Sequence, residues 1–166
     1  ALNECELLSL DVFGAYLRGK RRFSSAQVFL RIPPGLDDLR TTSGDPRLRY
    51  RSESGSPLLW RCDTNLYGLQ DAGRVWWIEA RDWLLLLGFK QSSVDPYIFS
   101  LHRPGPHNDF CIIGLYVDDS LGAYSTIYIK NWYLAAFEKR FHQSPDSGSD
   151  HPEFIAIQYS VSPDRR

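Results

Sequence analysis

The sequence contains no methionine, only three cysteines and no hydrophobic run long enough to cross a membrane. Because it begins with Ala1, we expect a processed product or a piece of a longer protein. Cys5, Cys62 and Cys111 lie far apart and form no CxxC pair, which argues against a disulfide framework and a zinc site. We therefore expect buried thiols, no membrane insertion and a reducing, intracellular compartment, with cytoplasm, nucleus and organelle left open.

Charge and composition restrict the function classes further. The 166 residues carry a net charge of −1, so any contact with nucleic acid needs a local basic patch. Apolar residues make up 43% and aromatic residues 14%, which is typical of a globular domain with a buried core. We predict a single, partial domain over residues 1–166, with an exposed polar loop at about 37–56.

Hydrophobic patterns predict strands that alternate with two long helices. The predicted strands cover residues 6–13, 27–32, 57–62, 97–101 and 153–162, with a strand–turn–strand unit at 111–125 and a turn or short helix at 14–22. The helices are predicted at 71–89, where Asp71 is a plausible N-cap and Gly88 a plausible stop, and at 126–141. This order predicts an α+β fold, an antiparallel sheet with helices packed on one face.

Two adjacent carboxylates interrupt the most apolar strand pair. In "CIIGLYVDDSLGAYS" (111–125), Asp118 and Asp119 follow directly after apolar residues. Such charges repel each other and lose hydration unless a cation compensates them, and Mg²⁺ prefers carboxylate oxygens. An aspartate in a turn often only caps backbone amides, so the pair alone leaves both interpretations open.

Asp11 ends a second apolar stretch, "LLSLD", in the same way. If these two strand ends lie side by side, their carboxylates form a site for two divalent ions. Two-metal sites promote in-line displacement at phosphorus. The spacing thus predicts phosphoryl-transfer chemistry as a hypothesis.

Five motifs follow one another along the chain. They read "LDVFGAYLRG" (10–19), "IPPG" (32–35), "LYGLQDAGRVW" (66–76), "GFKQSSVDPYIF" (88–99) and "YVDD" (116–119). Through them the chain resembles the reverse transcriptase of copia-type LTR retrotransposons over nearly its whole length. The resemblance implies a polymerase palm and RNA-directed DNA polymerase activity, with a template-primer of RNA or DNA and deoxynucleotides as partners.

The resemblance also implies roles for individual residues. The catalytic residues and ligands of Mg²⁺ or Mn²⁺ would be Asp11, Asp118 and Asp119. The residues expected at the nucleotide are Tyr16, Gln70 and Arg74. Tyr16 stands where the family has Phe, and its ring would exclude a 2′-hydroxyl.

The pattern is broken at two places. Asp71 replaces the family's Gln and Gly73 its Pro, so a carboxylate would face the triphosphate unless Gln70 substitutes. "RGKRR" (18–22) stands where the family usually carries acidic residues. It predicts contacts with a nucleic-acid backbone, or else a solvated surface turn. The residues concerned are Arg18, Lys20, Arg21 and Arg22.

Three functional interpretations remain. Only ten residues precede the first motif aspartate, so we expect the family's fingers, thumb and RNase H regions to lie outside this chain. The first interpretation is a reverse transcriptase-like domain with templated DNA synthesis by two-metal nucleotidyl transfer in its ancestry. The second is a domesticated, inactive remnant that serves as a structural or interaction subunit of a larger protein assembly. The third is a nucleic-acid-binding module that uses residues 18–22 without chemistry.

Overall fold

A five-stranded sheet forms the centre of the computed structural model, which describes residues 5–21, 27–31, 59–105, 109–142, 153–155 and 157–159. The strands are β1 (Glu6–Asp11), β4 (Lys90–Gln91), β5 (Ile98–Arg103), β6 (Asp109–Tyr116) and β7 (Asp119–Tyr124). Their order is β1-β7-β6-β5-β4, and every neighbouring pair is antiparallel. The predicted antiparallel sheet is confirmed.

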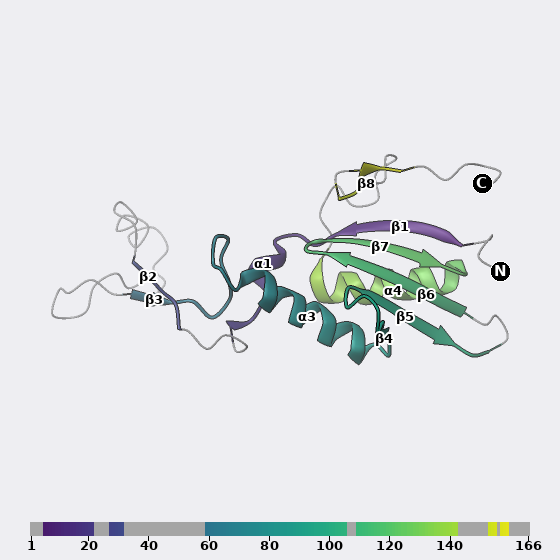
Figure 1. Cartoon of the computed structure of the whole chain (residues 1–166), viewed down its shortest axis with the longest axis horizontal. Helices are drawn as coiled ribbons and strands as arrows, with labels where there is room; N and C mark the ends of the chain where they lie inside the picture. The colour runs from purple at the N-terminus through teal and green to yellow at the C-terminus, as the bar shows by residue number, and fades with distance from the viewer. Residues whose placement is uncertain are drawn as a thin grey trace.

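Two fifteen-residue helices, α3 (Ala72–Leu86) and α4 (Ile127–Phe141), cover one face of this sheet (Figure 1). The short α1 (Ala15–Arg18) packs against α3. Inward and outward residues alternate along β7, where Ser120, Gly122 and Tyr124 are buried toward the helices. The α+β class predicted from the sequence is therefore confirmed. None of the described helices is long and apolar enough to cross a membrane.

Local signals explain where both long helices begin and end. Asp71 occupies the N-cap of α3, although its side chain makes no capping hydrogen bond. At the other end, Gly88 has φ 95°, and the amides of Gly88 and Phe89 donate to the carbonyls of Leu85 and Leu84. This is the Schellman arrangement that a glycine stop favours. The hydroxyl of Thr126 caps α4 by accepting from the amide of Ile129.

The core between helices and sheet is mainly aromatic. Its most buried members include Trp76, Leu84, Phe99, Ile113, Tyr124, Tyr133, Phe137 and Phe141. Trp83 packs edge-on against Phe141 with ring centroids 4.8 Å apart. Such pairs contribute about 0.5–1.5 kcal/mol each beyond their buried area. The core thus fixes α3 and α4 against the back of the sheet.

Two small two-stranded sheets complete the described structure. β2 (Phe29–Arg31) pairs with β3 (Leu59–Arg61), apart from the main sheet in Figure 1. β8 (Glu153–Phe154) pairs with β9 (Ile157–Gln158). The prediction of one strand over 153–162 is wrong, because the chain turns at Ile155, which has φ 54°. The predicted loop at 37–56 lies outside the described residues, and the single partial domain stays a prediction.

Candidate active site

The sheet brings two of the three predicted carboxylates opposite each other. In the pairing of β1 with β7, Asp11 is the direct partner of Asp119. Directly opposed residues of an antiparallel pair extend to the same face, with Cβ atoms about 4.5–5.5 Å apart. Both residues are half-buried, and they lie on the face away from the helices because their neighbours Leu10 and Ser120 are buried.

Asp118 completes the group from the turn between β6 and β7. Val117 and Asp118 form a two-residue connection, since Tyr116 pairs with Asp119. The amide of Val12 donates to the carbonyl of Asp118 over 3.1 Å, which ties the turn to the end of β1. The side chain of Asp118 is exposed. Three aspartates from two distant sequence segments therefore lie at one end of the sheet.

The turn has an unusual backbone. Val117 has φ 53°, a left-handed conformation that β-branched residues rarely adopt. Its carbonyl accepts a hydrogen bond of 2.5 Å from the indole N–H of Trp76, on α3. Strained backbones of this kind gather at functional sites.

The donor set suits a hard divalent cation, because carboxylate oxygens are the ligands that Mg²⁺ prefers. Opposed like charges also destabilise a strand pair, so a cation between Asp11 and Asp119 would relieve their repulsion. In the part of the chain that the structure describes, no three His, Cys, Asp or Glu side chains gather into a group able to hold a metal ion. One oxygen of Asp119 accepts from the amide of Ile155 over 3.2 Å. Metal binding thus requires these side chains to turn toward a common ion.

An apolar groove of about 690 Å³ lies along the same open face of the sheet. Its wall includes Leu7, Ile112, Leu121 and Ala123 from the strands and Ile155 from the β8–β9 turn. It reaches the carboxylate end, since Tyr116 and Val117 also line it.

The predicted nucleotide residues lie around the start of α3. Tyr16 lies on α1, after the strand that ends at Asp11. Its ring packs against the ring of Tyr67, with centroids 5.3 Å apart. A Cβ built at Gly73 would lie 3.8 Å from the hydroxyl of Tyr16. The two departures from the family, Tyr for Phe and Gly for Pro, therefore face each other. Gln70 and Arg74 are both exposed on the same stretch of chain.

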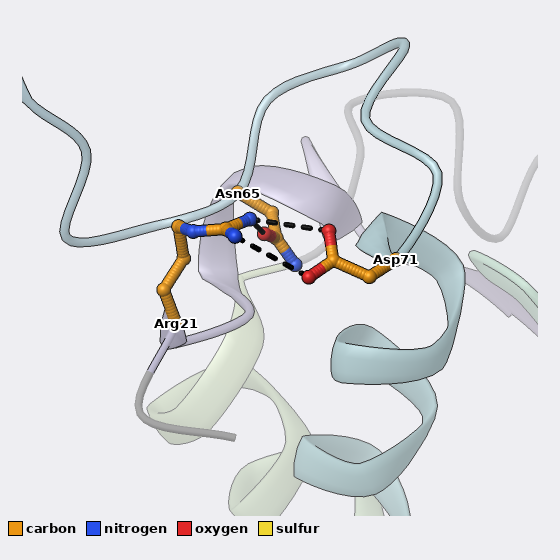
Figure 2. A network of polar contacts seen from close by, with 3 residues as sticks. All are labelled: Arg21, Asn65 and Asp71. Carbon is orange, nitrogen blue, oxygen red and sulfur yellow. Dashed lines mark hydrogen bonds and ion pairs between the residues drawn. The ribbon is translucent and has the colours of Figure 1, made fainter. Parts of the chain in front are cut away.

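Arg21 has a different environment from the one expected. Figure 2 shows its guanidinium facing both Asn65 and Asp71, where it donates to the Asn65 amide oxygen over 2.5 Å and to both Asp71 oxygens over 3.1 and 3.3 Å. The Arg21 side chain is only 6% exposed. The predicted contact of Arg21 with a nucleic-acid backbone stays a prediction, and in this structure the guanidinium is buried and ion-paired with Asp71.

The other basic residues of the 18–22 segment differ among themselves. Arg18 is half-exposed and donates to the carbonyl of Phe13 over 3.0 Å, whereas Lys20 is exposed. Arg22 lies outside the described residues. Among the described residues, Arg18 and Lys20 are the members of the predicted patch that are accessible at the surface, and the role of the patch stays a prediction.

Comparison with known proteins identifies the family. The model of a family described as "Reverse transcriptase (RNA-dependent DNA polymerase)" matches residues 1–158. The chain belongs to this reverse transcriptase family. It is 30% identical over 149 residues to the "Retrovirus-related Pol polyprotein from transposon RE2" of Arabidopsis thaliana, covering 90% of this chain and 9% of that protein. It is 33% identical over 112 residues to the polyprotein from transposon RE1 of the same plant, covering 68% and 6%. No solved structure matches at a significant level.

These matches confirm the resemblance to copia-type retrotransposon reverse transcriptases. The chain spans less than a tenth of the length of these two Pol polyproteins.

Sequence reasoning missed two contacts of this site. The hydrogen bond from Trp76 to the Val117 carbonyl could not be predicted from the motif, because a tryptophan at this position also fits the apolar face of α3. The Arg21–Asp71 ion pair did leave a signal. Both residues depart from the reverse transcriptase pattern, Arg21 toward positive charge and Asp71 toward negative charge, and opposite charges can pair.

Proposed function

We propose that this chain carries the metal-binding centre of templated DNA synthesis, with Asp11, Asp118 and Asp119 as the ligands. The observation that supports it best is the register that places Asp11 opposite Asp119 with Asp118 in the adjoining turn. Membership of the reverse transcriptase family supports the reaction class. The substrates would be a deoxynucleoside triphosphate and the 3′-hydroxyl of a primer on an RNA or DNA template.

The roles of the side chains follow from their positions. A bound Mg²⁺ or Mn²⁺ would supply charge neutralisation for the attacking and leaving oxygens. Asp11 and Asp119 would provide oxygen donors from the open face, and Asp118 from the turn.

Residues next to the carboxylates would hold the nucleotide. The ring of Tyr16 would occupy the space of a 2′-hydroxyl, and Tyr67 packs against it from the other side. Arg74, exposed in the first turn of α3, would bind a phosphate through its planar guanidinium. The exposed Gln70 would contribute an amide, and the Asp71 carboxylate would repel phosphate less than its charge suggests because Arg21 compensates it.

The experiment combines metal binding with catalysis. Mn²⁺ binding by titration calorimetry and primer extension on an annealed RNA template would be measured for the wild type, Asp118→Asn and the control Asp82→Asn. Asp82 is a partly exposed carboxylate of α3 paired with Arg81. We expect Asp118→Asn to weaken Mn²⁺ binding at least tenfold and abolish extension, while Asp82→Asn changes neither. Equal behaviour of the two variants would refute the assignment of Asp118.

A second candidate is the inactive remnant that serves as a subunit of a larger assembly. It is favoured by the Arg21–Asp71 pair, which stands where the family has a Gln. It is also favoured by the lack of a gathered metal site in the described residues. A well-folded wild type that neither binds Mn²⁺ nor extends a primer would select this alternative.

A further inference from the structure

The turn that carries Asp118 is conformationally demanding. Val117 occupies the first of the two central positions, with φ 53°, and Asp118 does not share this left-handed conformation. A positive φ at the first central position alone is the mark of a type II′ hairpin turn, which normally has glycine there. A valine in this place opposes the turn, so some other contact must hold it.

Packing of the turn's own side chains offers little support. Tyr116 and Val117 are 54% and 39% exposed. The contact from outside comes instead through the backbone, because the indole N–H of Trp76 donates to the Val117 carbonyl over 2.5 Å. Indole has one donor and no acceptor, so this bond fixes the carbonyl direction.

Trp76 is itself held firmly. It is 3% exposed and lies on the buried face of α3. Its ring packs edge-on against Phe141 of α4, with centroids 5.1 Å apart. The indole cannot follow a movement of the turn without disturbing the core, so the position of Val117 is set by the helix layer.

The next residue completes the connection. Asp118 follows Val117 directly, and its own carbonyl accepts from Val12, one residue after Asp11. The turn is thus held on one side by α3 and on the other by the end of β1. Both hydrogen bonds hold the backbone that carries Asp118 beside the end of β1.

We propose that Trp76 is a positioning residue for the metal site, whose indole N–H stabilises the strained Val117 turn and thereby places Asp118. This inference rests on the proposed function for its catalytic meaning. Without the N–H, the turn relaxes to a conformation that valine prefers, and Asp118 moves away from its partners. Replacing Val117 by glycine removes the strain and with it the need for the indole.

The test uses this chain with Trp76→Phe, Val117→Gly and the double variant. Trp83→Phe is the matched control, since Trp83 packs on the same Phe141 ring two turns further along α3. Amide hydrogen exchange of residues 116–120 is measured by NMR, and Mn²⁺ binding by calorimetry. The exchange measurement does not depend on metal or catalysis.

We expect Trp76→Phe to speed exchange in the turn at least tenfold and to weaken Mn²⁺ binding at least tenfold. The double variant with Val117→Gly should return both to within about threefold of the wild type, and Trp83→Phe should leave both nearly unchanged. Exchange that is unaffected by Trp76→Phe, or not rescued by Val117→Gly, overturns the inference. If Val117→Gly rescues exchange in a protein that never binds Mn²⁺, the stabilisation of the turn by Trp76 is retained and the proposed function is refuted instead.

A measurement that leaves Trp76 intact covers the case in which Trp76→Phe does not fold. In Val117→Gly, whose turn keeps its conformation, the indole N–H of Trp76 should stay bonded to the carbonyl of residue 117 and exchange at least tenfold more slowly than that of Trp83. Equal exchange of the two indoles, in the wild type or in Val117→Gly, contradicts the inference.

Discussion

The ion pair of Arg21 and Asp71 allows a quantitative prediction about stability. Asp71→Asn keeps the size of the side chain and removes the charge that compensates a guanidinium only 6% exposed. Loss of one partner of a fully buried pair costs about 3–5 kcal/mol. Since the Asp71 side chain is 34% exposed, water can solvate part of the remaining charge. We therefore expect a loss of about 2–3 kcal/mol, which is below the range for a fully buried pair.

The assay is reversible urea unfolding followed by tryptophan fluorescence, with a thermal melt beside it. A loss of this size lowers the melting temperature of a domain of this length by about 5–10 °C. The same direction is expected for Asp71→Gln, although Gln is the residue of the reverse transcriptase pattern at this position.

The control is the exposed pair of Arg61 and Asp63, whose side chains are 62% and 76% exposed. Asp63→Asn should cost less than about 0.5 kcal/mol. The double variant Arg21→Met/Asp71→Asn should cost less than Asp71→Asn and Arg21→Met together, because both single changes remove the same contact. If Asp71→Asn is no more costly than Asp63→Asn, the buried guanidinium does not depend on this carboxylate, and the reasoning fails.

Three further predictions concern the sheet and its core. Gly122→Ala should cost about 1–3 kcal/mol in urea unfolding, because its Cβ would overlap the Tyr124 ring, and an equal stability would contradict the packing. Burial raises the pKa of the Cys111 thiol from 9.0 to about 12. The unfolded chain therefore loses this proton at a lower pH than the folded protein does, and the free energy of unfolding falls as the pH rises above 9. The loss should reach about 1.4 kcal/mol at pH 10 and be absent in Cys111→Ala, apart from a smaller part from buried tyrosines. Lys130→Met should cost less than about 1 kcal/mol, since Glu6, its partner at 2.7 Å, is half exposed, and a larger loss would show an ion pair worth more than its exposure suggests.

The elements with strong local signals were predictable. α3 has an apolar face and a glycine stop at Gly88, and the structure places it at Ala72–Leu86. The strand pair around Asp118 has two apolar runs and a short turn, so its position followed from hydrophobic pattern alone. β4 has two residues and no pattern of its own, so only its pairing with β5 defines it.

The candidate site was predictable in its carboxylates and less so in their support. Asp11 and Asp118 share a sequence context, and the register of β1 and β7 follows once both strands are known. The surroundings of Arg21 could not be predicted, because a run of basic residues is typical of a surface, and only the fold reveals its contacts with Asp71 and Asn65. The β8–β9 turn was missed because the backbone conformation of Ile155 cannot be inferred from an apolar stretch.

The opposed pair of Asp11 and Asp119 has a consequence for how such a sequence changes once selection for catalysis ends. Like charges directly across two strands weaken the sheet by about 0.2–1 kcal/mol without a cation. Losing either aspartate would remove this repulsion, so a copy released from selection for catalysis would no longer carry it. A chain that still holds both keeps the repulsion beside the other contacts of the two side chains, and a bound cation would relieve it.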